Sequence, residues 1–61
     1  MKVGDRIIIA RKAKKLNRAA LARMVGLAQQ SLRSIEFNET IHPRRINKIA
    51  EVLETTPEWL L

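Results

Sequence analysis

The side chains best suited to specific chemistry gather on one face of a helix predicted over residues 28–37. At helical spacing they lie opposite the apolar residues of that segment, and they are Gln30, Arg33, Ser34 and Phe37. A glutamine amide matches the N6 and N7 edge of adenine, and an arginine guanidinium matches the O6 and N7 edge of guanine. This face is therefore suited to hydrogen bonding with bases, although the solvated face of any amphipathic helix has a similar composition.

The net charge of the chain also favours binding to nucleic acid. The 61 residues contain 12 Lys and Arg against 6 Asp and Glu, which gives a net charge of +6. Such an excess attracts polyanions, with nucleic acid first and an anionic membrane surface second.

Composition also excludes several classes of protein. The chain has one histidine, no cysteine and scattered carboxylates, so it lacks the ligands of a structural zinc site and a set of nucleophile, base and orienting group. We therefore expect no enzyme, no metal and no cofactor. No apolar run exceeds four residues, which excludes a membrane span. The first residues lack the apolar stretch of a secretory signal, so we expect a cytoplasmic protein.

Glycine, proline and asparagine divide the chain into short helices, and no segment alternates with the period of a strand. Asn17 is a good N-cap, Gly26 can end a helix in the left-handed conformation, and Thr56-Pro57 resembles a helix start. We predict an all-α fold in which residues 1–61 form one compact domain of five helices. The predicted helices are residues 2–15, 18–25, 28–37 and 45–54 and a final turn after Pro57.

The most specific pattern spans the second and third of these helices. Ala22 is small where the helices must cross, Gly26 suits the turn, and Leu21, Leu32 and Ile35 fix the angle between the helices. This pattern resembles the helix-turn-helix of the repressor and Cro proteins of lambdoid phages, and the similarity covers nearly the whole chain. The matching segments are residues 16–22, 25–26, 29–32, 36, 43–44 and 58–60. Ala28 departs from the family because a Ser or Thr cap is common there, and Asn38 because glycine is common there.

The resemblance implies a lambda-repressor-like fold with its helix-turn-helix at about residues 18–37. It also implies that the second helix of the motif enters the major groove of double-stranded DNA. The base-contacting residues would be Gln29, Gln30, Arg33 and Ser34. Contacts to the DNA backbone or minor groove would come from Asn17, Arg18, Arg23, Arg44 and Arg45.

Arg11 and Glu36 each lie inside an apolar stripe of their helix. An unpaired buried charge costs several kcal/mol, so these two residues are predicted to form a structural ion pair with each other. The family resemblance implies the same pair.

Two apolar features do not fit the predicted core. Ile7, Ile8 and Ile9 are consecutive and cannot all face inward, so we predict partial exposure or burial at the edge of the apolar stripe, with a contact surface as the alternative. Phe37 stands among polar residues; it could stack on a thymine methyl group, meet a partner subunit or pack on the following loop, and packing on the loop is our prediction.

The residues and the resemblance together predict a sequence-specific transcriptional repressor that occupies a pseudo-palindromic operator in the bacterial host cell, associated with the nucleoid. One recognition helix reads few base pairs, so we expect a homodimer that is weak off DNA. Its interface is predicted at Ile41, His42, Thr56, Glu58 and Leu60. An antitoxin or a restriction-modification controller with the same fold is an alternative, as is a basic protein-interaction or membrane-surface module. A complete Cro-like protein and the N-terminal domain of a longer repressor both fit the sequence.

Overall fold

The computed structural model describes residues 2–39 and 45–61, and these ranges contain five helices and no strand. The predicted all-α class and the number of helices are confirmed. The helices are α1 (Val3–Ala13), α2 (Arg18–Val25), α3 (Gln29–Glu36), α4 (Ile46–Leu53) and α5 (Pro57–Leu60).

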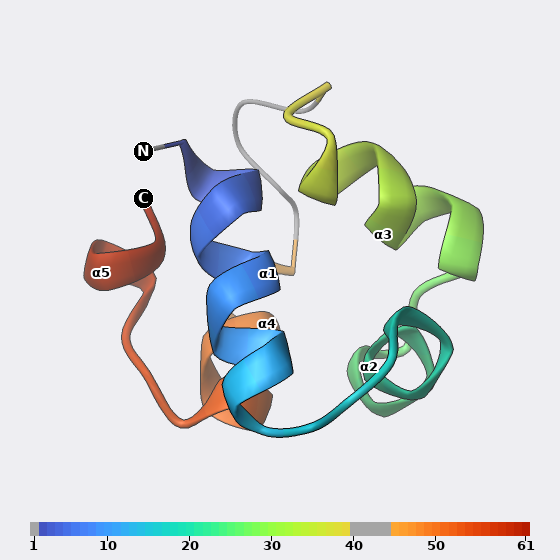
Figure 1. Ribbon diagram of the computed structural model, residues 1–61, viewed down its shortest axis with the longest axis horizontal. Helices are drawn as coiled ribbons and strands as arrows, with labels where there is room; N and C mark the ends of the chain where they lie inside the picture. Colours follow the sequence, from blue (N-terminus) through green and yellow to red (C-terminus); the bar gives the residue numbers. More distant parts are fainter. Residues whose placement is uncertain (1, 40–44) are drawn as a thin grey trace.

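The helices surround one core, with α1 between the other elements (Figure 1). Helix α3 packs against α1 and α2, whereas α5 packs against α1 and α4 on the other side. Each helix contributes one residue with no exposed surface, and these residues are Ile7, Leu21, Leu32, Ile49 and Leu60. A small domain has little apolar surface to bury, so this shared core is what fixes the orientation of α3.

Capping residues explain where the helices begin and end. Asn17 accepts a hydrogen bond from the Ala20 amide at 2.7 Å, and Gly26 ends α2 in the left-handed conformation with a φ of 84°. Both limits of α2 are therefore as predicted. The predicted limits of α1 and α4 were too wide because Lys15 and Glu54 also adopt left-handed angles, which stop the α-helix.

The beginning of α1 and the end of α3 lie in close contact. The Gly4 amide donates a hydrogen bond to the Asn38 side-chain oxygen at 2.8 Å. A Cβ atom on Gly4 would lie 2.5 Å from the Glu36 carbonyl oxygen, closer than real Cβ atoms approach backbone. Gly4 is therefore the point where α1 meets the end of α3.

None of the helices in the described ranges has the length and apolar character needed to cross a bilayer. Within those same ranges, no group of three or more His, Cys, Asp or Glu side chains is placed to hold a metal ion.

Candidate nucleic-acid interface

Helix α3 presents a polar face to solvent. Its Gln29, Gln30 and Arg33 side chains are exposed and Ser34 is half-buried, whereas the opposite face is buried against α1 and α2. No side chain caps the first turn of α3, because the residue at that position is Ala28. The free amides and the positive end of the helix dipole therefore lie beside Gln29 and Gln30, an arrangement that suits an anion.

The residues predicted to contact a nucleic-acid backbone fall into three groups. Arg23 is exposed on α2, and Asn17 is exposed while it caps the same helix. Arg18 and Arg45 already contact protein groups: Arg18 pairs with Glu36, and Arg45 Nη1 donates to the Val25 carbonyl at 3.4 Å. Arg44 lies outside the described residues.

The Glu36 carboxylate joins three helices. It is fully buried, with Arg11 Nε of α1 at 2.8 Å from Oε2 and Arg18 Nε of α2 at 3.0 Å from Oε1. Arg11 Nη2 lies 3.4 Å from Oε1, and Arg11 Nη1 also donates to the Leu16 carbonyl at 2.9 Å. The pair of Arg11 and Glu36 is the one expected from the sequence, but the participation of Arg18 was missed. Two guanidinium groups on one carboxylate leave a net positive charge beneath the exposed face of α3.

The helix-turn-helix family model matches residues 7–60, which is most of the chain. The chain belongs to the helix-turn-helix family. Helix α2, the turn at Gly26 and helix α3 form the motif, and the chain is a lambda-repressor-like helix-turn-helix DNA-binding domain, as the sequence resemblance predicted.

Solved structures of a repressor and of a master regulator are similar to this helix-turn-helix domain over nearly its whole length. The P22 c2 repressor in complex with the synthetic operator 9T has a TM-score of 0.92 and 31% identity, with 100% of this chain and 94% of that chain covered. SinR, the master regulator for biofilm formation, in complex with DNA has a TM-score of 0.87 and 33% identity, with 95% of each chain covered. In the SinR–SinI complex the TM-score is 0.90 and the identity 34%, with 97% of this chain and 59% of that chain covered.

Phe37 follows the last turn of α3 in this helix-turn-helix domain. Its side chain is half exposed, and the guanidinium carbons of Arg33 and Arg18 lie 4.6 and 5.6 Å from the ring centroid. We predicted that Phe37 packs on the loop that follows. That loop, residues 40–44, lies outside the described residues, and the contacts that the structure shows are cation–π contacts with the two arginines.

The residues of the helix-turn-helix domain that were predicted to form a dimer interface differ in their exposure to solvent. Leu60 has no exposed surface, so its assignment to an interface is wrong: α5 folds back and turns Leu60 into the core. Glu58 is exposed, and Thr56 is exposed with its hydroxyl accepting from the Trp59 amide at 3.1 Å. Ile41 and His42 lie outside the described residues.

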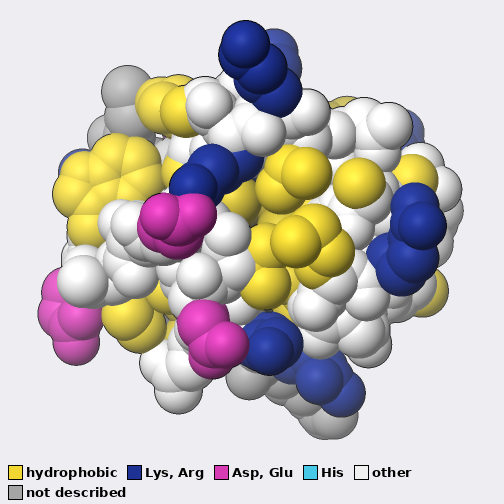
Figure 2. All heavy atoms as spheres, turned by 90° about the horizontal axis from the view of Figure 1, so that it is seen from below, with side chains coloured by type: hydrophobic (Ala, Val, Ile, Leu, Met, Phe, Trp, Pro, Cys, Tyr) yellow, Lys and Arg dark blue, Asp and Glu magenta, His cyan; other side chains and the backbone are white. Residues whose placement is uncertain are grey.

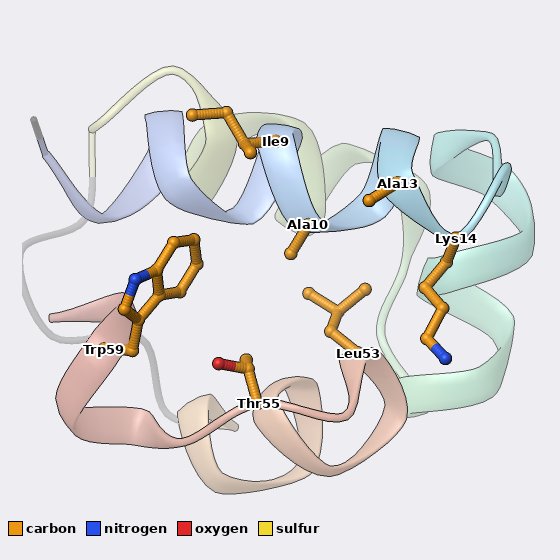
Figure 3. A pocket seen from close by; sticks show the side chains of 7 residues that line it. All are labelled: Ile9, Ala10, Ala13, Lys14, Leu53, Thr55 and Trp59. Carbon is orange, nitrogen blue, oxygen red and sulfur yellow. The ribbon is translucent and has the colours of Figure 1, made fainter.

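An open hollow of about 430 Å³ lies between α1 and the α4–α5 segment, on the side of α1 away from α3 (Figures 1 and 3). Trp59 and Lys14 stand at its two ends, with Ala10, Ala13 and Leu53 between them (Figure 3). Ile9 lines it and is exposed, in agreement with the predicted partial exposure of the isoleucine run. Figure 2 shows apolar side chains gathered on the face seen from below the view of Figure 1, with charged groups around them.

Proposed function

We propose that this chain, a DNA-binding transcriptional repressor of the helix-turn-helix family, represses by occupying a pseudo-palindromic operator as a homodimer. The observation that carries the proposal is the exposed face of α3, where Gln29, Gln30 and Arg33 project from a helix held on its other side by the Glu36 ion cluster. Hydrogen-bonding groups held on a rigid helix cannot adapt to a mismatched base, so a mismatch lowers the binding free energy. No catalytic step is needed, because a protein bound at the operator blocks RNA polymerase from the DNA.

Base reading and backbone contact are assigned to different side chains. Gln29, Gln30 and Arg33 read base edges, and Ser34, which is short and half-buried, reaches a sugar, a phosphate or a bridging water. Asn17 and Arg23 contact phosphates from the two ends of α2.

Two other cations act mainly through the protein. Arg18 is tied to Glu36, and Arg45 holds the last turn of α2 through the Val25 carbonyl, so both position α2 and their charge attracts DNA at longer range. Arg44, which lies outside the described residues, remains assigned to the minor groove or its phosphates.

A dimer is required because one recognition helix contacts only a few base pairs. Two-fold symmetry places two such helices in successive major grooves, about 34 Å apart. The subunits would meet around the exposed Thr56 and Glu58, together with Ile41 and His42, which lie outside the described residues. This surface is small, so the dimer is weak free in solution and forms cooperatively on the operator, in the bacterial cytoplasm at the nucleoid. The P22 c2 repressor bound to a synthetic operator and SinR bound to DNA support the binding of operator DNA.

Selection from random double-stranded DNA followed by sequencing tests the proposal. We expect enrichment of a pseudo-palindrome with half-site centres about 10 base pairs apart. Insertion of about five base pairs between the half-sites turns one groove to the opposite side of the duplex, so cooperative binding should be lost while weak half-site binding remains. A purely basic surface module would show no enriched sequence, and a monomeric reader would bind the lengthened operator as tightly as the original.

A further inference from the structure

Arg33 is the cation of the recognition helix whose hydrogen-bond donors are available. Among residues 2–39 and 45–61 its guanidinium has no hydrogen-bond or ion-pair partner. The carboxylate nearest to it along α3 is Glu36, but both oxygens of Glu36 are taken by Arg11 and Arg18. The ion cluster therefore keeps Glu36 from neutralising Arg33 at the DNA-facing surface.

Phe37 supplies the contact that Glu36 does not. The Phe37 amide donates to the Arg33 carbonyl at 3.0 Å, so the two residues are one helical turn apart, and the Arg33 guanidinium carbon lies 4.6 Å from the ring centroid. An aromatic ring contacts the flat face of a guanidinium, whereas the five N–H groups point outward along its edge. A stacked arginine therefore loses conformational freedom and keeps all its donors.

A second arginine also contacts the ring. Arg18, anchored to the buried Glu36 carboxylate at 3.0 Å, lies 5.6 Å from the Phe37 centroid. Half of the Phe37 surface remains exposed, so the aromatic residue lies at the DNA-facing surface without being fixed in the core. The chain of contacts runs from Glu36 through Arg18 and Phe37 to Arg33.

We propose that Phe37 is a positioning residue that orients the Arg33 guanidinium for two hydrogen bonds to the O6 and N7 atoms of a guanine. The inference rests on the proposed function and names its ligand more closely: a half-site with a guanine at the position read by Arg33. Bidentate contact needs the guanidinium plane aligned with the base plane, and a stacked side chain reaches that alignment with less loss of rotamer entropy.

The test measures relative affinities for the selected half-site and for every single-base variant of it, using the full chain. For Phe37→Leu we expect the preference for guanine at the Arg33 position to fall roughly two- to fivefold, the range set by an exposed cation–π contact. Preferences at other positions should stay unchanged. Phe37→Tyr should retain the wild-type preference because it keeps the aromatic face.

A double-mutant comparison separates positioning from general packing. In an Arg33→Ala background, Phe37→Leu should have no further effect at that base pair. Trp59→Leu is the matched control, because Trp59 is also a part-exposed aromatic with an arginine, Arg6, 5.3 Å from its ring, but it lies on α5. This control should leave every base preference unchanged.

A second measurement needs no DNA. In proton NMR spectra the Arg33 side chain should show ring-current shifts in the wild type and in Phe37→Tyr, and these should disappear in Phe37→Leu. A uniform loss of affinity for all sequences in Phe37→Leu, or unchanged guanine preference despite lost ring-current shifts, would overturn the positioning role. Absence of any sequence preference in the wild-type chain would instead overturn the proposed function.

Discussion

The Gly4 amide and the Asn38 side-chain oxygen are joined by a 2.8 Å hydrogen bond, although the two residues are 34 positions apart in sequence. Asn38 thus caps α1 from the end of α3. Its Nδ2 atom also lies 3.5 Å from an Asp5 carboxylate oxygen in the same first turn. The contact ties the end of α3 to α1, the helix at the centre of the fold.

Substitution of Gly4 should destabilise the domain. A Cβ there meets the backbone oxygens of Ile35 and Glu36, which cannot rotate away. We expect Gly4→Ala to lower the free energy of unfolding by roughly 1 to 3 kcal/mol, measured by urea denaturation. Lys12→Ala, an exposed change in the same helix, should alter it by less than about 0.5 kcal/mol. Equal stability of Gly4→Ala and the wild type would mean that α1 and α3 are not in close contact.

Two substitutions at Asn38 separate its two contributions. Asn38 has a φ of 62°, which glycine tolerates and alanine does not. Asn38→Gly should lose only the side-chain cap, about 1 kcal/mol, whereas Asn38→Ala should lose roughly 1 to 2 kcal/mol more. Thermal and urea unfolding of both variants measure the difference. If glycine and alanine have equal effects, backbone conformation contributes nothing at this position.

The Glu36 cluster predicts strong energetic coupling. Glu36→Ala leaves Arg11, with a side chain 11% exposed, without its main partner, and should destabilise the domain by about 3 kcal/mol. Replacing Arg11 with Met and Glu36 with Leu together should cost less than the sum of the two single changes. The same cycle with Lys48 and Glu51, an exposed pair on α4, should show coupling below about 0.5 kcal/mol. Additive effects at Arg11 and Glu36 would contradict the geometry of the cluster.

Base-reading and phosphate-contacting residues should differ in their response to salt. Gln30→Ala should weaken the selected site by about 1 to 3 kcal/mol and leave non-specific DNA nearly unaffected. Arg23→Ala should weaken all sequences alike and reduce the slope of log K against log salt by about one. Titrations at several salt concentrations on selected and random duplexes distinguish them. A parallel loss on both duplexes for Gln30→Ala would remove it from the base-reading set.

Much of the fold was predictable because its signals are local. Asn17 and Gly26 delimit α2 through a cap and a left-handed turn, both of which depend on neighbouring residues only. The pairing of Glu36 with Arg11 could be predicted, because an unpaired charge inside an apolar stripe is costly and these two residues carry opposite charges. Arg18 could not be added to that pair, because its approach depends on how α2 crosses α3.

What the sequence did not predict concerns residues whose environment is set by tertiary packing. Leu60 was assigned to an interface as part of an apolar chain end, but a four-residue helix beginning at Pro57 turns it inward and leaves Trp59 and Leu61 outside. Alternation within so short a helix cannot be read from composition. Similarly, nothing in the sequence around Gly4 indicates that another helix passes within contact distance.

Helix α3 has its anchoring residues and the residues proposed to read bases on separate faces, and this has an evolutionary consequence. Leu32, Ile35 and Glu36 hold α3 in place, whereas the side chains of Gln29, Gln30 and Arg33 take no part in the core. Exchange of the exposed residues can therefore change the preferred operator with little change in stability. Related regulators can diverge in their targets by drift on one helix face, and an engineer can graft a new specificity onto the same scaffold.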